Sequence, residues 1–225
     1  MCVINHTWKF VFVHIPKTGG TSVAHALDQL CTYRDLQLGG TDFGEASHRA
    51  YQDKYGIGKH SFAAELRRCL GREAWATYTS FAVFRDPVDR ALSTYRYLRL
   101  HQDHYTFMSD IDDFGSLIRS KIWQTPGPDR MFMPQTRWIR NERKPLKPIV
   151  DTLLLLTDLD RGLQGVLSEA GVPSSKTKKI SLDRFNSTDG SKFASEPSEQ
   201  DLDIVRNRYA EDYETLSTYG FSATS

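Results

Sequence analysis

The residues best suited to bind a charged ligand lie near the N-terminus, in the segment HIPKTGGTS at 14–22. The adjacent glycines Gly19 and Gly20 allow the backbone to turn sharply and to approach a ligand closely. Lys17 adds a positive charge, and hydroxyl donors come from Thr18, Thr21 and Ser22. A helix that follows such a turn directs its first N–H groups and its positive end toward an anion. The segment therefore predicts a cradle for a phosphate or sulfate group, whereas a plain tight turn with a surface lysine is the simpler alternative.

The order of these residues bears on the class of nucleotide site. The P-loop of ATPases follows the pattern GxxxxGK[ST], in which the lysine comes after the glycines. Here Lys17 precedes Gly19 and Gly20. This order argues against an ordinary ATPase or nucleotide kinase, although Asp158 after the run LLLLT could imitate the acidic metal ligand of such an enzyme.

A second candidate anion site lies in the segment FAVFRDPVDRALSTY at 81–95. Arg85 stands at the C-terminal end of an expected buried strand, where ligands bind in open α/β sheets. Its planar guanidinium suits bidentate binding of a phosphate. Ser93 follows about two helical turns later and can supply a hydroxyl to the same group.

The alternative for Arg85 is a structural ion pair. Asp86 and Asp89 are near enough in the sequence to be its partners. We expect Arg90 to take the structural role and Arg85 to meet the ligand.

The alternation of apolar runs with helical patterns predicts the fold that positions these segments. Strands alternating with helices indicate an α/β fold of three layers, with a parallel β-sheet flanked by helices. The length suits a single domain over residues 1–225. Buried strands are expected over 9–15, 79–87 and 149–159. Helices are expected over 21–30, with Thr21 or Ser22 at its start, and over 61–71, 88–100, 160–170 and 198–217. A long loop is expected over 33–59, and short helical pieces with turns over 101–148.

Composition and charge exclude several classes of protein. The chain of 225 residues has 29 basic and 28 acidic side chains and a net charge of +1, which gives no basic excess for binding nucleic acid or a membrane surface. Its three cysteines are far apart, and no Cys or Cys/His pattern suits a metal site. The N-terminal segment has neither the basic region nor the long apolar run of a signal peptide. We therefore expect a cytoplasmic protein without a metal.

Both candidate anion motifs together resemble the superfamily of sulfotransferases that use PAPS (3′-phosphoadenosine 5′-phosphosulfate). FVHIPKTGGTS is especially similar to the carbohydrate branch, which includes the heparan sulfate 2-O-sulfotransferases and small bacterial relatives. The resemblance continues through GKHSFAAELRRCLGREAWATYTSFAVFRDP, MPQTRWI and YAEDYETLSTYGF. It implies the P-loop-like sulfotransferase fold. The chain departs from related sequences at TDLDRGL, where they often carry a Glu-Asn pair.

The resemblance also implies roles for individual residues. The motif PKTGGTS would hold the 5′-phosphosulfate through Lys17, Thr18, Gly19, Gly20, Thr21 and Ser22. The motif FRDPVDRALS would hold the 3′-phosphate through Arg85 and Ser93. A late loop would close over the nucleotide with Asn186 and Ser187, beside Arg184 and Thr188, although a solvated surface loop explains this segment equally well.

Sulfuryl transfer requires a base for the acceptor proton and a cation for the leaving phosphate oxygen. Lys17 suits the second role. His60 matches the catalytic histidine of the carbohydrate branch, and its place at the start of the expected helix 61–71 would disfavour the charged imidazole. His48 and the carboxylates of Glu65 and Asp42 are alternatives. Residues that could shape the acceptor site are Trp123, Gln135, Arg137 and Trp138.

The sequence thus predicts transfer of a sulfuryl group from PAPS, with PAP as product, to a hydroxyl or amine of a saccharide or glycan. A small-molecule acceptor, a nucleotide kinase and an inactive nucleotide-binding module are the alternatives. The expected partners are PAPS and the acceptor, with no nucleic acid and no membrane, in a monomer or homodimer.

Overall fold

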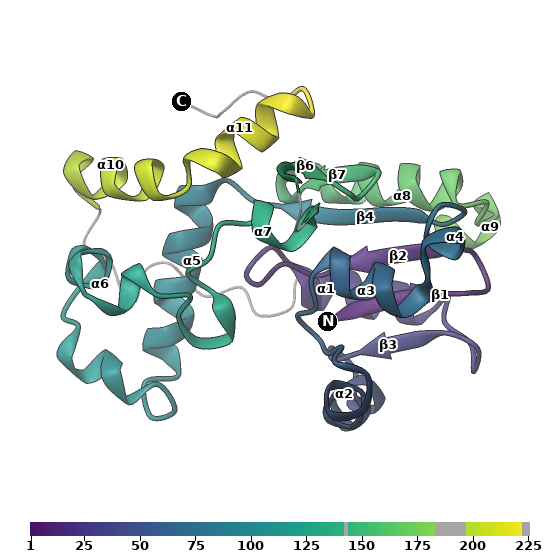
Figure 1. The fold of residues 1–225 in the computed structure, drawn as a ribbon, viewed down its shortest axis with the longest axis horizontal. Coiled ribbons are helices and arrows are strands. Elements are labelled where there is room, and N and C mark those ends of the chain that lie inside the picture. The colour runs from purple at the N-terminus through teal and green to yellow at the C-terminus, as the bar shows by residue number, and fades with distance from the viewer. Residues whose placement is uncertain (142–143, 183–196, 222–225) are drawn as a thin grey trace. The chain divides into compact units, whose positions relative to one another are not determined.

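The fold is described from a computed structural model, which covers residues 1–141, 144–182 and 197–221. The chain forms two compact units (Figure 1). The first consists of residues 1–84 and 136–185, and the second of residues 85–135 and 186–225. Each unit has its own apolar core.

The first unit is built on a five-stranded sheet with the strand order β3-β1-β2-β4-β7. Strand β2 pairs in parallel with β4, and β4 in parallel with β7. Strand β1 is antiparallel to both β2 and β3, so every strand except β1 runs in the same direction. The strands are β1 (Cys2–Asn5), β2 (Phe10–Val13), β3 (Leu36–Leu38), β4 (Thr79–Phe84) and β7 (Thr152–Leu155).

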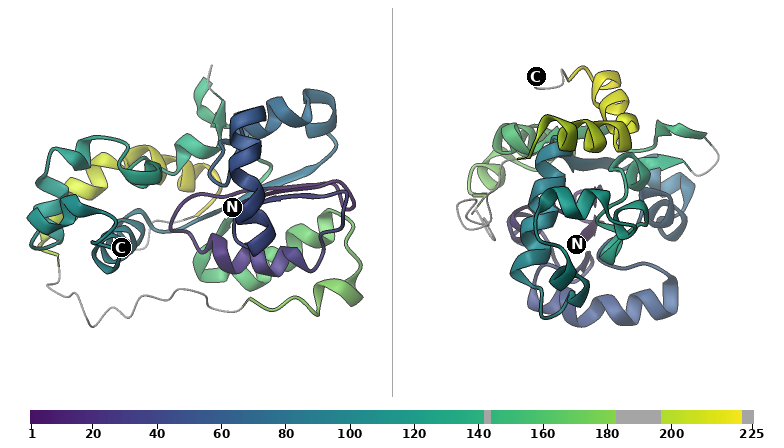
Figure 2. Two further views of the ribbon diagram at one scale, coloured as in Figure 1. Left: turned by 90° about the horizontal axis from the view of Figure 1, so that it is seen from below. Right: turned by 90° about the vertical axis from the view of Figure 1, so that its left-hand side faces the viewer.

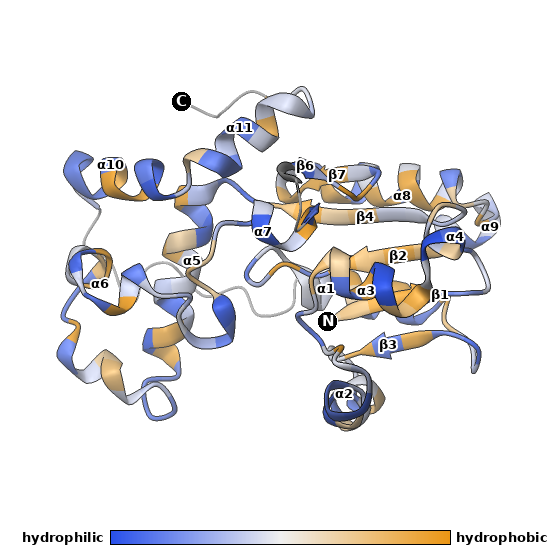
Figure 3. Cartoon of the chain, viewed as in Figure 1, coloured by the Kyte–Doolittle hydropathy of each residue, from blue (hydrophilic) through white to orange (hydrophobic). Residues whose placement is uncertain are grey.

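Alternating side chains of the central strands face helices on the two sides of the sheet. Phe10 and Phe12 of β2 contact Phe81 of β4, with ring centroids 6.2 and 5.3 Å apart. They share one apolar cluster with α1 (Gly20–Asp28) and α8 (Leu159–Glu169). Figure 2 shows α1 and α8 on one side of the sheet and α3 (Ala63–Leu70) on the other, and Figure 3 shows the apolar character of β1 and β2. The predicted α/β fold with helices on both faces of a largely parallel sheet is confirmed.

The prediction of a long loop over 33–59 is wrong. Strand β3 and the 14-residue helix α2 (Asp42–Tyr55) occupy most of this range. The hydroxyl of Thr41 accepts a hydrogen bond from the N–H of Gly44 and caps the helix, and Gly56 ends it with a φ of 69°. Gly44 alone is buried in α2, which explains why the segment has no apolar period.

Short elements complete the first unit. The strand expected over 149–159 is limited to β7, and residues 156–158 form a 3₁₀ turn that leads into α8. The remaining elements are α4 (Arg72–Trp75), α7 (Thr136–Ile139), α9 (Ser174–Thr177) and the hairpin of β5 (Arg140–Asn141) with β6 (Lys144–Pro148).

The second unit is helical in its described residues. The predicted helix after the second motif is α5 (Pro87–Leu100), and short helical pieces follow, as expected. The helix expected over 198–217 is two helices, α10 (Glu199–Arg208) and α11 (Ala210–Thr218), because Tyr209 leaves the helical conformation between them. Their core includes Trp123, whose ring lies 5.0 Å from that of Phe132 and 5.7 Å from that of Tyr209. The short pieces are η1 (Thr106–Asp110), α6 (Phe114–Arg119), η2 (Ile122–Gln124) and η3 (Pro128–Arg130).

In the part of the chain that the structure describes, every helix is too short or too polar to cross a bilayer.

Candidate active site

The turn after β2 carries the first predicted anion motif. Helix α1 begins at Gly20, and its N-cap is Gly19 in the left-handed conformation with a φ of 81°. The prediction that Thr21 or Ser22 caps the helix is therefore wrong, because both lie inside its first turn. Within the described residues no side chain caps this helix end, and its first turn has no acidic residue. The first-turn N–H groups and the positive helix end therefore suit an anion.

Lys17 adopts a backbone conformation that is uncommon for a residue with a side chain. Its φ is 70°, in the left-handed region. This conformation costs a non-glycine residue about 1–2 kcal/mol. Such strain is characteristic of binding sites, because a surrounding structure must hold it in place.

The two glycines are required for different reasons. Gly19 has a positive φ, and a β-carbon there would also lie 2.7 Å from Cδ1 of Leu156. At Gly20 the space is taken by His14, since an added β-carbon would lie 1.8 Å from Cδ2 and 2.1 Å from Nε2 of that ring. Thr18 closes the turn, because its buried hydroxyl donates to the carbonyl oxygen of Ile15 at 2.9 Å.

His14 connects this turn to His60. The Nδ1 atoms of the two histidines are 3.0 Å apart, and their ring centroids are 4.8 Å apart. His14 is only 3% exposed. Burial is the main cause that holds the pKa of His14 well below its ordinary value. The Met1 nitrogen, His60 and Lys17 act in the same direction, and a hydrogen bond to the backbone of Lys59 opposes them.

His60 lies in a turn that precedes α3, and not at the helix start as the sequence suggested. The helix begins at Ala63 with Phe62 as its N-cap. The argument from the helix dipole therefore does not apply to His60. The contact with His14 is the feature that ties His60 to the anion motif.

The alternative bases have other contacts. Glu65 accepts a hydrogen bond from the N–H of Phe62 at 2.9 Å, so its carboxylate caps α3. Nε2 of His48 lies 3.9 Å from the carboxylate of Glu45, which also pairs with Lys59 at 3.2 Å. Asp42 is the first residue of α2.

A cleft of about 220 Å³ adjoins the anion motif within the first unit. The segment TDLDRGL, which departs from the family pattern, forms one wall through Thr157, Asp158 and Asp160. Asp158 pairs with Arg161 at 2.8 Å. The cleft is lined by Gly19, Ser22, Leu156, Thr157, Asp158, Leu159, Asp160 and Leu182.

The part of the second predicted motif that follows β4 belongs to the second unit, where the side chain of Gln135 holds the backbone of Arg85. The buried amide of Gln135 accepts from the N–H of Arg85 at 3.0 Å and donates to its carbonyl oxygen at 2.8 Å. Asp212, also buried, accepts from the N–H of Gln135 at 2.9 Å. Burial lowers the pKa of Arg85, and the carboxylate of Asp89 opposes that effect.

The charged neighbours of Arg85 have structural roles. The carboxylate of Asp86 caps α5 by accepting from the N–H groups of Val88 and Asp89. Arg90 is fully buried and donates to the carbonyl oxygens of Met133 and Met131 at 2.9 and 3.1 Å. Ser93 lies in α5 and is 8% exposed.

The residues suggested for an acceptor site lie mostly in the interior. Trp123 and Trp138 are both fully buried, and Trp138 packs edge-on against Phe62. Gln135 is occupied by the backbone of Arg85. A tryptophan surface for stacking a sugar is therefore not formed by these two residues, whereas Arg137 is exposed. Asn186, Ser187, Arg184 and Thr188 lie outside the described residues.

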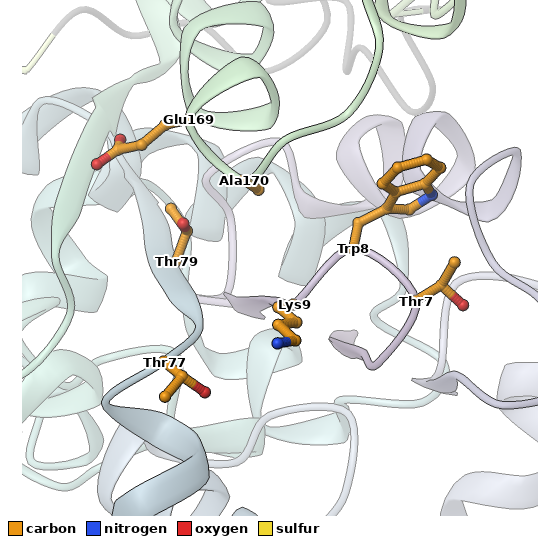
Figure 4. A pocket seen from close by; sticks show the side chains of 7 residues that line it. All are labelled: Thr7, Trp8, Lys9, Thr77, Thr79, Glu169 and Ala170. Carbon is orange, nitrogen blue, oxygen red and sulfur yellow. The ribbon is translucent and has the colours of Figure 1, made fainter.

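A second concavity of about 210 Å³ lies at the other end of the central strands, where Lys9 precedes β2 and Thr79 begins β4 (Figure 4). Ligands of parallel sheets bind at the carboxyl ends of the strands, and this concavity is at their amino ends. None of the motif residues lines it. Among the described residues, no group of three or more His, Cys, Asp or Glu side chains is placed to hold a metal ion.

Comparison with known proteins gives one match. Neither a search of curated proteins nor a search of solved structures finds a similar protein. The family model described as "Sulfotransferase family" matches residues 1–219, which include both anion motifs and His60. The chain therefore belongs to the sulfotransferase family.

Proposed function

We propose that this protein transfers the sulfuryl group of PAPS to a hydroxyl or amine of an acceptor, with a saccharide as the preferred acceptor class. The observation that carries the proposal is the turn at 14–20. There a strained lysine and an uncapped helix start meet at the carboxyl end of a central strand, beside a histidine pair.

The chemistry of this turn fits the 5′-phosphosulfate end of the donor. The first-turn N–H groups of α1 can donate to its oxygens, and Lys17 can neutralise its charge. The absence of an acidic side chain from the first turn of this described helix removes one source of repulsion. Ser22, in the same turn, lines the adjoining cleft.

The 3′-phosphate distinguishes PAPS from ATP, and we assign it to Arg85 and Ser93. The clamp by Gln135 fixes the backbone of Arg85, so less conformational entropy is lost when its guanidinium binds. Its partly desolvated charge also gains more from a phosphate than an exposed arginine would. The assignment of residues 1–225 to a single sulfotransferase domain stays a prediction.

His60 is the proposed general base. It takes the proton of the acceptor hydroxyl or amine while the acceptor atom forms its bond to sulfur. The bond between sulfur and the 5′-phosphate oxygen breaks, and the side chain of Lys17 stabilises the negative charge that remains on that oxygen. The product nucleotide is PAP.

The test is a transfer assay with PAPS labelled in its sulfuryl group. The acceptor panel contains unsulfated glycosaminoglycan oligosaccharides, simple phenols and aliphatic amines. Labelled product from an oligosaccharide is the expected result, and labelled phenols or amines alone would replace the saccharide with a small-molecule acceptor. In parallel, PAP is expected to raise the Tm, and ATP far less, because a ligand specific for the folded state stabilises it. A lack of transfer to every acceptor, together with equal stabilisation by ATP and PAP, would overturn the proposal.

His60→Ala isolates the base. The rate of transfer is expected to fall about 10²–10⁴-fold. PAP affinity is expected to stay the same, because His60 is not assigned to the donor. If His60→Ala transfers at the parent rate, His48 becomes the next candidate.

A further inference from the structure

The concavity at the amino ends of β2 and β4 lies within the first unit and away from the residues assigned to the donor and the base (Figure 4). Three separate elements contribute its polar side chains. Lys9 comes from the turn before β2, Thr79 from the start of β4 and Glu169 from the end of α8. Pockets for drug-sized molecules have volumes of about 300–1,000 Å³, so a concavity of about 210 Å³ suits a smaller group.

Two residues of this concavity occupy positions that are unfavourable for the fold alone. Lys9 has a φ of 54°, in the left-handed region that disfavours a residue with a side chain. Glu169 is the last residue of α8, where the negative end of the helix dipole repels a carboxylate, and the last turn of this described helix has no basic residue. Departures from local preference are expected at functional sites. Because both residues line the same concavity, we take them together as a sign of ligand binding.

The polar groups of the concavity are available to a ligand. Within the part of the chain that the structure describes, the side chains of Lys9, Thr79 and Glu169 take part in no ion pair or hydrogen bond. The hydroxyl of Thr77 donates to the carbonyl oxygen of Ala74 at 2.9 Å and can still accept. The ammonium of Lys9 only donates, the carboxylate of Glu169 only accepts, and a hydroxyl does both. The concavity therefore offers donors as well as acceptors.

The wall formed by residues 6–9 is fixed before a ligand binds. The carboxylate of Asp35 accepts from the N–H of Thr7 at 3.0 Å and from its hydroxyl at 2.9 Å. The N–H of Trp8 donates to the side-chain oxygen of Asn5 at 2.7 Å, and the carbonyl oxygen of Lys9 accepts from the N–H of Thr79 at 2.9 Å. A wall held in this way loses little conformational entropy when a ligand binds.

The two opposite charges restrict the class of ligand. A simple anion would face the carboxylate of Glu169, and a simple cation would face the ammonium of Lys9. A neutral polyhydroxyl ligand suits both, because a hydroxyl can donate to the carboxylate and accept from the ammonium. Trp8 is half-buried against the apolar core of the unit and adds an apolar surface with an N–H at its edge. A sugar ring combines hydroxyls with apolar C–H groups, whereas a small zwitterion matches only the charges.

We propose that this concavity binds one neutral sugar unit of a saccharide chain, with Lys9 and Glu169 as hydrogen-bond partners of its hydroxyls. Lys9 precedes β2 and His14 follows it, so five steps of roughly 3.3 Å separate the two ends of the strand by about 17 Å. An acceptor chain long enough to span this distance can hold a remote unit here while another unit reacts at the turn 14–20. This part of the inference rests on the proposed function, because it takes the bound chain to be the acceptor.

Sugar binding is tested without donor and without transfer. The other tryptophans, Trp75, Trp123 and Trp138, are at most 8% exposed, so the indole N–H of Trp8 is the signal that reports on the concavity. Protein with ¹⁵N-labelled tryptophan is titrated by NMR with neutral hexasaccharides of glucose, galactose, mannose and N-acetylglucosamine, and Trp8→Phe identifies the Trp8 signal. At least one hexasaccharide should shift it, with a Kd on the order of 1 mM, since a sugar unit has few atoms in contact. No shift with any of them, or a shift with glycine betaine alone, would overturn the proposal.

Two substitutions remove ligand contacts without harming the fold. Lys9→Gly removes the ammonium and relieves the left-handed φ, and Glu169→Gln removes a charge from the negative end of α8. Each should keep the parent Tm or raise it, and each should weaken sugar binding about 3–10-fold, the effect of one hydrogen bond. Lys9→Arg keeps a cationic donor, and Glu214→Gln changes an exposed carboxylate elsewhere, so both should bind sugar like the parent. Parent affinity in Lys9→Gly and Glu169→Gln would refute the site.

The outcomes separate this inference from the proposed function. In Glu169→Gln, KM for a long oligosaccharide acceptor should rise about 3–10-fold with kcat unchanged, while an acceptor too short to span the distance keeps its KM. A parent KM for the long acceptor would show that the bound chain is not the acceptor. If saccharides bind but none accepts a sulfuryl group, the proposed function fails and the sugar site stands. If oligosaccharides are sulfated but none shifts the Trp8 signal, the function stands and the sugar site is refuted.

Discussion

The ring of His14 occupies the space that a side chain at Gly20 would need. A β-carbon at Gly20 would lie 1.8 Å from Cδ2 of His14, far inside contact distance. His14 in turn contacts His60. The second glycine of the motif therefore has a structural role beyond the approach of a ligand, since it admits the histidine that contacts the proposed base.

The methyl group of Gly20→Ala should displace the ring of His14 and so disturb its contact with His60. His14 is buried and cannot simply rotate into solvent, so we expect a loss of about 1–3 kcal/mol in the free energy of unfolding, typical of overpacking. A displacement of His60 by about 1 Å can lower the rate of transfer about 100-fold. Denaturant unfolding and single-turnover transfer measure the two effects.

The matched control is Gly165→Ala in α8. An added β-carbon there meets nothing within 4 Å. Alanine favours a helix over glycine by about 1 kcal/mol, so this variant should be more stable and fully active. Gly20→Ala with parent stability and parent activity would show that His14 tolerates the methyl group.

Lys17 has two properties to test: its strained backbone conformation and the positive charge that we assign to donor binding. Two substitutions separate the effects of these properties. Lys17→Gly and Lys17→Ala both remove the charge, so both should weaken PAP binding by about 1.5–3 kcal/mol. Only glycine relieves the left-handed φ of 70°, so Lys17→Gly should be about 1 kcal/mol more stable than Lys17→Ala. Thermal unfolding and PAP titration test both expectations.

Lys9 is the control, because it has a φ of 54° and precedes β2 at the opposite end of that strand. Lys9→Gly should also be more stable than Lys9→Ala, while both bind PAP normally. Weaker PAP binding in the Lys9 variants would mean that loss of any lysine charge lowers affinity, and the role assigned to Lys17 would lose its support.

Much of the fold follows from local patterns in the sequence. The apolar run at 9–15 and the turn PKTGG predict a strand, a turn and a helix, and these are β2 and α1. TSFAVF and VDRALSTYRYLRL similarly correspond to β4 and α5. The two strands are short, continuously apolar runs with turn residues beside them, and the two helices have apolar residues at helical spacing, so the local pattern identifies each element.

Two elements that the sequence did not predict, β1 and α2, depend on features that a local apolar pattern does not show. Strand β1 has only four residues, and its hydrogen bonds go to β2 and β3, so the pairing defines it. Helix α2 lacks an apolar face, although Thr41 and Gly56 at its ends were signals that could have found it.

The central contact of the candidate site also depends on the fold. The resemblance to the carbohydrate branch indicates His60 as a base, but the contact between His14 and His60 joins segments 46 residues apart. The role of Gln135 is similar, since it contacts Arg85 across 50 residues. A single sequence gives no distance between such segments, so only the folded chain identifies His14 and Gln135 as supports of the predicted residues.

Arg85 and Gln135 should affect the same ligand in different ways. Arg85→Ala should weaken PAP binding by about 2–3 kcal/mol through lost charge-assisted bonds, with little change in stability. Binding of ATP, which has no 3′-phosphate, should not change. Isothermal titration with both nucleotides tests this, and an equal loss for ATP and PAP would contradict the assignment of Arg85 to the 3′-phosphate.

Gln135→Leu should act through the backbone of Arg85. It leaves the N–H and carbonyl groups of Arg85 without the amide that now bonds both, so stability should fall by about 1–3 kcal/mol. PAP affinity should fall too, because Arg85 is then less well positioned. The control in the same unit is Gln124→Leu, since that exposed side chain only accepts from Arg208. Normal PAP affinity in a folded Gln135→Leu protein would show that the clamp is purely structural.

The low pKa of His14 predicts a specific dependence of stability on pH. In the folded protein, burial keeps the pKa of His14 well below its ordinary value of 6.5. The unfolded chain therefore binds a proton at this residue when the pH falls below about 6.5, and the folded chain does not. More protons bound by the unfolded state mean lower stability, so this contribution is fully present above pH 6.5 and is lost as the pH falls. Between pH 7.5 and 5.5 the loss from one such group is about 1.4 kcal/mol.

His14→Asn removes the titrating group but keeps a hydrogen-bond acceptor. Urea unfolding at pH 7.5 and 5.5 should therefore show a smaller acid loss in this variant than in the parent, by about 1.4 kcal/mol. The same substitution at an exposed histidine, His104→Asn, provides the control, and the acid loss of His14→Asn is compared with it. If the parent and His14→Asn lose the same stability, His14 is protonated in the folded protein at pH 5.5.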